Sequence, residues 1–243
     1  MTILRLSKSK LLDFKKCPRK YYLKNFTPFG RQNNESKPDY MVLGTVVHEF
    51  IEKFNKQEDD VKYLQTYLFK DEDIRMHILN FYQILQNFNL QYPLHAELKI
   101  EDSNRDLVGI VDAIYEYEGE KGVGNAVIDY KTGKFNPKYK SDSEFELYIY
   151  ALLVEENLGI TVDYIGMFFT KNPKCMTKDE DNTGWSFIEP INRRKLKRVE
   201  GELNKIRDKI LDGEFPRKES KLCGWCDFVQ MCEVYNDPVL SGE

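Results

Sequence analysis

The sequence predicts a protein of the mixed α/β class, and three observations lead to this prediction. Apolar residues recur at helical spacing through most of the chain before Leu90. From Leu94 the spacing changes to the alternation that is typical of strands. Helical spacing returns at Glu144 and is followed by further strand-like and helical segments. A chain of 243 residues is long enough for a substantial core, and we expect residues 1–243 to form a single domain.

The segments before the strands are expected to be helical. Ser7 or Ser9 is a suitable N-cap for a first helix that runs to about Lys24. Residues 30–39 are polar, contain a proline and are expected to form a loop. Two further helices are expected at residues 42–54 and at about 74–90.

The second half of the chain is expected to alternate between strands and helices. Strands are expected at residues 94–100, 106–117 and 125–131, with Gly119, Gly122 and Gly124 supplying a turn between the last two. A helix at 144–158, strands at 161–170 and 184–188, and a charged helix at 192–211 follow. The tail from Glu214 carries a proline and three cysteines, and we expect it to be irregular.

Composition narrows the class of protein and its compartment. Hydrophobic residues make up 41% and charged residues 31%, as in ordinary soluble globular proteins. We expect no membrane partner, because no apolar run is long enough to span a bilayer. The first eight residues lack the apolar core of a secretion signal, which favours a cytoplasmic location. In that compartment the five cysteines are expected to be metal ligands or bystanders rather than disulfides.

The charge pattern allows a local nucleic-acid site but does not require one. The net charge of −4 argues against a protein whose whole surface binds nucleic acid, although it says little about one site. Basic residues cluster at 8–24, 131–140 and 193–198. Each cluster either meets phosphates or is a solvated face of a helix or loop.

The tripeptide Asp129-Tyr130-Lys131 ends the apolar run Ala126-Val127-Ile128. In a strand, Asp129 and Lys131 project to the same side. A carboxylate and an ammonium at this spacing are the minimum for metal-assisted hydrolysis of a phosphodiester. Alone, an Asp-x-Lys sequence in a strand is more often a solvated surface pair. It indicates a metal site only if other parts of the chain supply further ligands.

Two other residues supply such ligands. Asp112 is an acidic residue in the otherwise apolar strand Gly109-Ile110-Val111, and an antiparallel hairpin would bring it near Asp129. Two converging carboxylates repel each other unless a cation lies between them. Gly44, His48 and Glu52 share one face of a helix, where His48 could offer a nitrogen to that cation. His77 and His95 have no such context and are expected to be ordinary packing residues.

The cysteines form a second group of candidate ligands. Cys223, Cys226 and Cys232 lie close together in the tail, and Cys17 is the obvious fourth member, whereas Cys175 falls outside the pattern. Four thiolates suit a Cys₄ zinc site or an iron–sulfur cluster, and spacing alone does not choose between them.

With these residues in place, the chain resembles the RecB/AddB-type branch of the PD-(D/E)XK nuclease superfamily. The segments that carry the resemblance include His48 on a helix, Gly109-Ile110-Val111-Asp112, Ile128-Asp129-Tyr130-Lys131-Thr132-Gly133 and a later helix with Tyr150. The opening also resembles the family's N-terminal segment, above all in Cys17-Pro18-Arg19-Lys20-Tyr21-Tyr22. The resemblance spans almost the whole chain with the motifs in the family's order. It implies a restriction-endonuclease-like core, a central mixed sheet flanked by helices.

The resemblance also implies roles for matched residues. The metal ligands would be His48, Asp112, Asp129 and the main-chain carbonyl of Tyr130, and Lys131 would orient or activate the attacking water. The cation would be Mg²⁺ or Mn²⁺, and an imidazole ligand suits Mn²⁺ somewhat better. Glu97 would hold a water on the metal or is a plain surface glutamate.

The cysteine pattern looks like that of the iron–sulfur nucleases of this branch. The resemblance therefore favours a [4Fe–4S] cluster over zinc, with Cys17, Cys223, Cys226 and Cys232 as ligands. Such a cluster would join the N-terminal segment to the tail at residues 220–235.

One position departs from the family pattern. The family has Gln-x-x-x-Tyr on the helix after the catalytic strand, and this chain has Glu146 and Tyr150. The spacing of four keeps both side chains on one face. The extra negative charge puts contact between Glu146 and substrate in question, while Tyr150 stays a candidate catalytic residue.

The sequence therefore predicts a metal-dependent DNA nuclease, specifically an exonuclease acting on single-stranded DNA or DNA ends in recombination, repair or replication. It would work in the cytoplasm or at the nucleoid. No helicase motif is present, so any unwinding would come from a helicase or recombination partner. Two alternatives are a weakly active DNA-binding subunit of a recombination or repair assembly and a zinc-stabilised structural adaptor.

Overall fold

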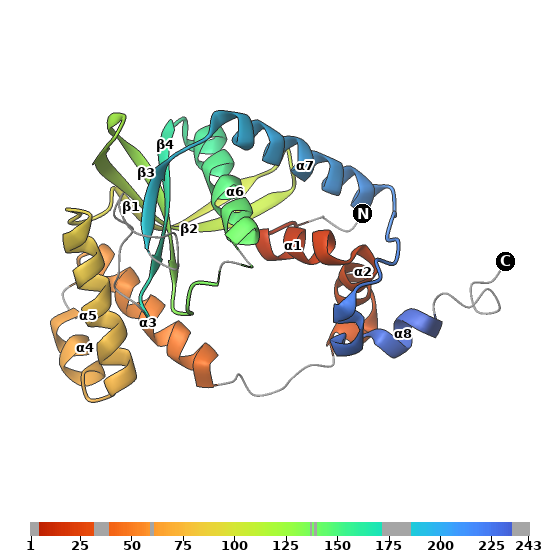
Figure 1. The fold of residues 1–243 in the computed structure, drawn as a ribbon, viewed down its shortest axis with the longest axis horizontal. Helices are drawn as coiled ribbons and strands as arrows, with labels where there is room; N and C mark the ends of the chain where they lie inside the picture. The colour runs from red at the N-terminus through yellow and green to blue at the C-terminus, as the bar shows by residue number, and fades with distance from the viewer. Residues whose placement is uncertain are drawn as a thin grey trace. The chain divides into compact units, whose positions relative to one another are not determined.

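The computed structural model describes residues 5–31, 39–58, 61–136, 138, 140–171 and 186–234. Two compact units make up the chain, and the ribbon is shown in Figure 1. The larger unit consists of Lys37–Asp102 and Val108–Val199, and the smaller unit of Met1–Ser36, Ser103–Leu107 and Glu200–Glu243.

A five-stranded mixed sheet forms the centre of the larger unit. Its strands are β1 (His95–Asp102), β2 (Leu107–Gly119), β3 (Gly122–Lys131), β4 (Val162–Phe169) and β5 (Phe187–Pro190), in that spatial order. Strands β2 and β3 are antiparallel, β3 and β4 are parallel, and β4 and β5 are antiparallel. The parallel pair is joined through a helix, as a crossover between parallel strands requires.

Helices cover this sheet. They are α3 (Asp39–Asn55), α4 (Val61–Leu68), α5 (Glu72–Asn87) and α6 (Lys140–Leu158), and α6 lies across the sheet from α3 and α5 (Figure 1). Buried residues of α3 and α5, such as Phe50 and Phe81, pack with Tyr115, Ile128 and Phe168 of the sheet. Sheet and helices together confirm the expected mixed α/β fold class and a restriction-endonuclease-like core.

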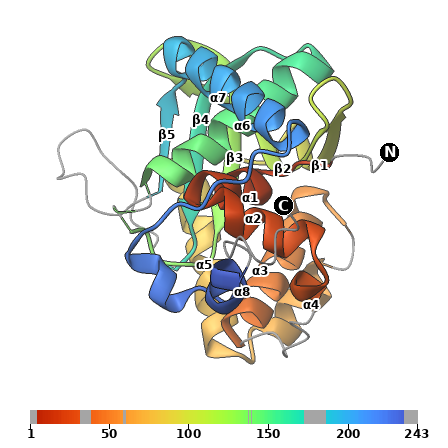
Figure 2. The ribbon, with the colours of Figure 1, turned by 90° about the vertical axis from the view of Figure 1, so that its right-hand side faces the viewer.

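The smaller unit is helical. It contains α1 (Lys8–Lys16), α2 (Pro18–Phe26), the 3₁₀ helix η1 (Pro28–Arg31), most of α7 (Arg193–Leu211), the 3₁₀ helix η3 (Lys221–Trp225) and α8 (Val229–Val234). Figure 2 shows α8 beside α2, which it contacts. The tail is therefore partly helical, where the sequence predicts irregular structure.

The single helix expected up to Lys24 is two helices. Ser7 caps the first of them, because its side chain accepts a hydrogen bond from the backbone of Lys10. Cys17 is extended, with φ −159° and ψ 109°, and separates α1 from α2. The cause is Pro18, since a proline disfavours helical backbone at the residue before it and suits the first position of a new helix. The break leaves Cys17 at a helix junction.

The remaining differences concern element boundaries and one extra helix. The sequence does not predict helix α4. Strand β3 begins at Gly122, so the turn between β2 and β3 is shorter than the stretch from Gly119 to Gly124 that the sequence predicts as a turn. Most of the loop expected at residues 30–39 lies outside the described residues, as does Cys175. Within the described residues, no helix combines the length and apolar character needed to cross a membrane.

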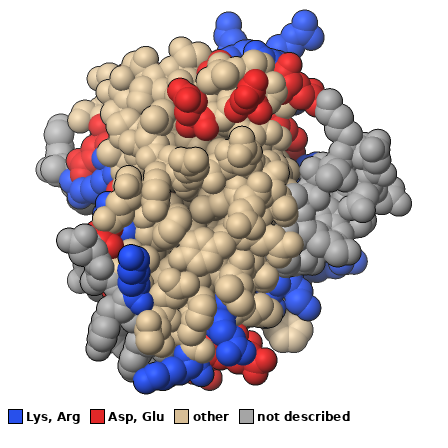
Figure 3. Space-filling model, turned by 90° about the vertical axis from the view of Figure 1, so that its left-hand side faces the viewer, with Lys and Arg blue, Asp and Glu red and all other residues tan. Residues whose placement is uncertain are grey.

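The side of the molecule on which α4 and α5 lie carries few charges in its centre. In Figure 3, most Lys, Arg, Asp and Glu side chains stand around the edges of this view, and uncharged side chains fill the middle.

Candidate metal centre

The hairpin of β2 and β3 brings Asp112 and Asp129 together. Ala113 pairs with Ile128, so Asp112 and Asp129, the next residues along each strand, face each other. The Asp112 carboxylate accepts a hydrogen bond of 2.7 Å from the backbone N–H of Tyr130. Asp112 is 8% exposed and Asp129 is 1% exposed. Two carboxylates buried this deeply side by side are costly without a cation nearby, and the Lys131 ammonium lies 2.7 Å from one of them.

His48, Glu97 and Asp112 form a group that suits a metal ion. One ligand atom from each lies within 4.8 Å of the other two. They come from α3, β1 and β2, and His48 and Glu97 are half-buried. One imidazole nitrogen with carboxylate oxygens is a donor set for Mn²⁺ or Mg²⁺, so these residues fit a divalent cation.

Glu97 of this group has an unusual backbone conformation. Its φ is 48°, in the left-handed region that glycine favours, although it lies within strand β1. A non-glycine residue there costs on the order of 1 kcal/mol or more, and such strain is often found at functional sites. The sequence predicts Glu97 only as a partner of a metal-bound water or as a surface residue, because no local pattern indicates a left-handed residue inside a strand.

Lys131 lies between two carboxylates. Its Nζ is 2.7 Å from Asp129 Oδ2 and 3.0 Å from Glu146 Oε2. The Lys131 side chain is 28% exposed, so it is reachable from solvent while both partners are more buried. Helix α6 thus brings Glu146 to the end of strand β3 that carries Lys131.

Tyr150, one turn after Glu146, is only 3% exposed. A Cβ atom built on Gly109 of β2 would lie 3.2 Å from its ring and 2.6 Å from Leu153. Gly109 therefore allows α6 to pack closely on β2, and any larger residue there would push Tyr150 and Leu153 away.

A buried hydrogen-bond network anchors helix α3 to strand β3. Asn55 Nδ2 donates to the Tyr130 hydroxyl at 3.0 Å, and the hydroxyls of Tyr130 and Tyr115 are 2.8 Å apart. Burial raises the pKa of Tyr115 and of Tyr130, so both stay protonated and able to donate. Asn55 lies seven residues after His48, on the same side of α3. The network therefore ties the helix of His48 to the residue between Asp129 and Lys131.

His77 is a hydrogen-bonded packing residue, as expected. It is fully buried, and its Nδ1 lies 2.8 Å from the Thr170 hydroxyl. The backbone N–H of Thr170 in turn donates to the Lys131 carbonyl at 2.9 Å. Burial lowers the pKa of His77, and the nearby Lys171 lowers it further, so the ring is neutral. His77 thus supports the strand end that carries Lys131. His95, by contrast, is exposed at the start of β1.

The four predicted cluster cysteines line one pocket within the smaller unit. Cys17 comes from the junction of α1 and α2, Cys223 and Cys226 flank the end of η3, and Cys232 lies on α8. Burial raises the pKa of the Cys232 thiol, and Cys17 and Cys226 raise it further, so these thiols are within electrostatic reach of one another. Four converging thiols fit a tetrahedral metal or a cubane cluster, which would bind them as thiolates.

A family model described as PD-(D/E)XK nuclease superfamily matches residues 5–233. The chain is also similar to the crystal structure of a putative exonuclease from Eubacterium rectale, with a TM-score of 0.56 and 12% sequence identity. That match covers 94% of this chain and 88% of the other, and at such low identity it concerns the fold. No curated protein sequence matches this chain significantly.

Proposed function

The chain belongs to the PD-(D/E)XK nuclease superfamily, and from this premise we propose that it is a metal-dependent exonuclease of the RecB/AddB type. Its substrate would be single-stranded DNA or DNA ends, in recombination, repair or replication. The observation that carries the proposal is the group of His48, Glu97 and Asp112 within 4.8 Å, beside the ion pair of Asp129 and Lys131. The name of the structural neighbour supports exonuclease activity for that protein, and we extend it to this chain as part of the proposal.

The residues of the site would have different roles in hydrolysis of the phosphodiester. His48, Asp112, Asp129 and the Tyr130 carbonyl would hold Mg²⁺ or Mn²⁺, with Glu97 as a further ligand or as a partner of a bound water. A cation held there neutralises the charge that grows on the phosphate. Lys131 would orient the attacking water, since its ammonium lies beside Asp129 at 2.7 Å and is open to solvent. Tyr150 is a candidate catalytic residue from the sequence, but it is only 3% exposed, so we propose that it acts by supporting the position of α6 and Glu146.

A [4Fe–4S] cluster is proposed for the smaller unit, in preference to zinc. Cys17, Cys223, Cys226 and Cys232 would bind it. Their placement around one pocket supports the idea that the cluster connects the N-terminal helices to the tail. We further propose that residues 1–243 act as one nuclease domain, that a helicase or recombination partner supplies unwound DNA, and that the protein works in the cytoplasm or at the nucleoid.

A nuclease assay tests the proposed function. End-labelled single-stranded and double-stranded DNA are incubated with the protein and Mg²⁺, Mn²⁺ or a chelator. We expect metal-dependent loss of terminal nucleotides, faster on single strands and at least as fast with Mn²⁺ as with Mg²⁺. A protein that cleaves neither substrate with either metal would not be this nuclease.

Glu146 offers a test of how strongly Lys131 is restrained. Replacing Glu146 by glutamine removes one of the two carboxylates at Lys131 Nζ and one negative charge near the DNA phosphates. We expect kcat/KM on single-stranded DNA to rise about fivefold, which corresponds to about 1 kcal/mol. Steady-state cleavage of a labelled oligonucleotide measures it.

The matched control is Glu144→Gln on the same helix, since Glu144 pairs with Lys195 instead. This variant should cleave like the wild type. A loss of activity in Glu146→Gln alone would mean that the carboxylate itself is required. A rise in kcat/KM much larger than fivefold would instead favour the alternative that the natural protein is a weakly active DNA-binding subunit.

A further inference from the structure

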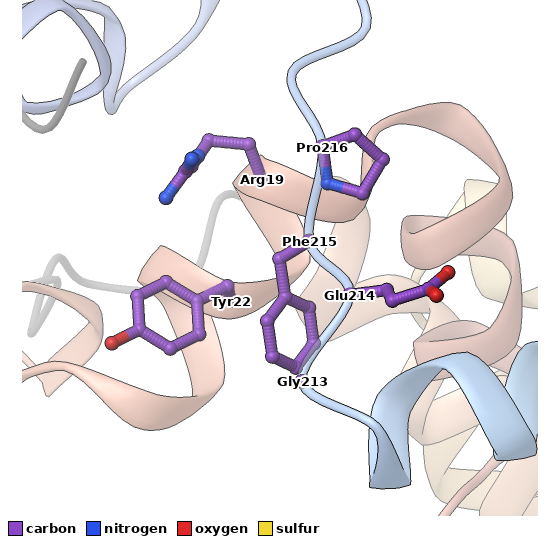
Figure 4. A pocket seen from close by; sticks show the side chains of 6 residues that line it. All are labelled: Arg19, Tyr22, Gly213, Glu214, Phe215 and Pro216. Carbon is purple, nitrogen blue, oxygen red and sulfur yellow. The ribbon is translucent and has the colours of Figure 1, made fainter.

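An open pocket of about 690 Å³ lies in the smaller unit, outside the cysteine cluster. Arg19 and Tyr22 of α2 line it together with the segment Gly213–Pro216 that follows α7. Helix α7 ends where Gly213 adopts a left-handed φ of 73°, which turns the chain back toward α2. Figure 4 shows Arg19 and Tyr22 projecting to the same side, with the Phe215 ring next to Tyr22.

Aromatic rings form one wall of this pocket. The rings of Tyr22 and Phe215 lie 4.9 Å apart at 35°, and those of Tyr22 and Phe26 lie 6.0 Å apart and stacked. Phe26 is 46% exposed, whereas Tyr22 and Phe215 are half-buried, so the group of rings is partly open to solvent. Exposed rings of this kind are platforms on which unpaired bases stack.

Arg19 gives the pocket a cation that pairs with no carboxylate in the described part of the chain, although it lies close enough to the Cys232 thiol to lower the pKa of that thiol. Two lysines of the same helix have acidic partners: Lys20 lies 3.6 Å from Asp227 and Lys24 lies 2.7 Å from Asp13. No such partner of Arg19 occurs within the described ranges, and its buried Nε has no hydrogen-bond acceptor there. Glu214 also lines the pocket, but its carboxylate points away from Arg19 and Tyr22 (Figure 4).

We propose that this pocket binds a nucleotide of single-stranded DNA. The base stacks on the Tyr22 and Phe215 rings that line the pocket, and the Arg19 guanidinium binds a backbone phosphate. Single-stranded DNA is the occupant that meets both features, because the bases of a duplex are already stacked and its phosphates need no aromatic wall. The inference rests on the proposed function and adds a substrate contact outside the metal centre.

Binding of a fluorescein-labelled oligothymidine tests the pocket. Fluorescence anisotropy is measured in an Asp129→Asn background, so that cleavage does not interfere. Tyr22→Leu and Phe215→Leu should each weaken binding roughly 5- to 100-fold, the range for loss of one base–ring stack. Arg19→Gln should weaken binding and reduce the dependence of log Kd on log salt by about 0.7, the value for one phosphate contact on a single strand.

Lys24→Gln is the matched control, because it removes the same charge from the same helix outside the pocket. It should leave affinity within a factor of about two, as for a solvent-exposed ion pair. Iron content and thermal unfolding of each variant show whether the cysteine cluster and fold are kept.

Wild-type affinity in Tyr22→Leu and Phe215→Leu would overturn the inference. So would a loss of affinity in Arg19→Gln that is accompanied by loss of iron, since Arg19 would then act through the cluster. These outcomes leave the proposed function standing if the wild-type protein still cleaves DNA, whereas absence of cleavage by the wild type contradicts the proposed function itself.

Discussion

Replacing Asp129 by asparagine is expected to lower the rate of DNA cleavage by on the order of a thousandfold while leaving the fold intact. The carboxylate would be lost from a cation site worth several kcal/mol to the transition state, and about 4 kcal/mol corresponds to this factor. Asparagine has nearly the same shape, and Lys131 keeps Glu146 as a partner at 3.0 Å. Cleavage of labelled single-stranded DNA measures the rate, and thermal unfolding measures the fold.

A metal titration separates loss of the cation from other causes. Mn²⁺ at a hundred times its Kd should stabilise the wild-type protein by about 2.7 kcal/mol, because it binds only the folded state. Asp129→Asn should lose most of this stabilisation. Without metal, the stability of the variant should change little, since removing a buried charge beside Asp112 is favourable whereas losing the ion pair with Lys131 is unfavourable.

Asp163→Asn is the matched control, because Asp163 is also a sheet carboxylate and accepts a 3.0 Å hydrogen bond from the backbone of Asn125. Its cleavage rate and its response to Mn²⁺ should match the wild type. Full activity in purified Asp129→Asn protein would contradict the assignment of this strand end as the catalytic centre.

The fold was largely predictable because its signals are local. The change from helical spacing to alternation at Leu94 marks the start of the sheet, and the glycines after β2 mark the hairpin. The hairpin then sets Asp112 opposite Asp129 by register alone. Two further local signals mark helix boundaries in the first half of the chain. Pro18 divides the first helix, and Asp60, directly before the first residue of α4, is a residue type that favours a helix N-terminus.

The rest of the site depends on contacts between distant residues. Asn55 meets Tyr130 across 75 positions of sequence, and His77 meets Thr170 across 93. No periodicity or motif encodes such pairs, because each is made by the packing of a helix on the sheet. The role of Glu97 was equally hidden, since its left-handed backbone becomes visible only in the folded strand.

Loss of the cysteine cluster is expected to unfold the smaller unit first. Cys226→Ala should remove the iron of the proposed cluster, because three thiolates no longer complete the ligand set. A cross-link between Cys17 and Cys223 closes a loop of about two hundred residues, which on the chain-entropy model is worth on the order of 4–5 kcal/mol. Hydrogen exchange should therefore speed up in α1, α2 and α8, while the paired strands β2 and β3 stay protected.

The fifth cysteine provides the control. Cys175→Ala removes a thiol that lies outside the ligand pattern, so iron content and exchange rates should stay at wild-type values. Mn²⁺-dependent stabilisation of the larger unit should persist in Cys226→Ala, because His48, Glu97 and Asp112 all belong to that unit. Retention of iron and of slow exchange in α1 and α8 of Cys226→Ala would contradict a structural cluster. If the wild-type protein contained zinc in place of iron, the four cysteines would still cross-link the chain, but as a zinc site rather than an iron–sulfur cluster.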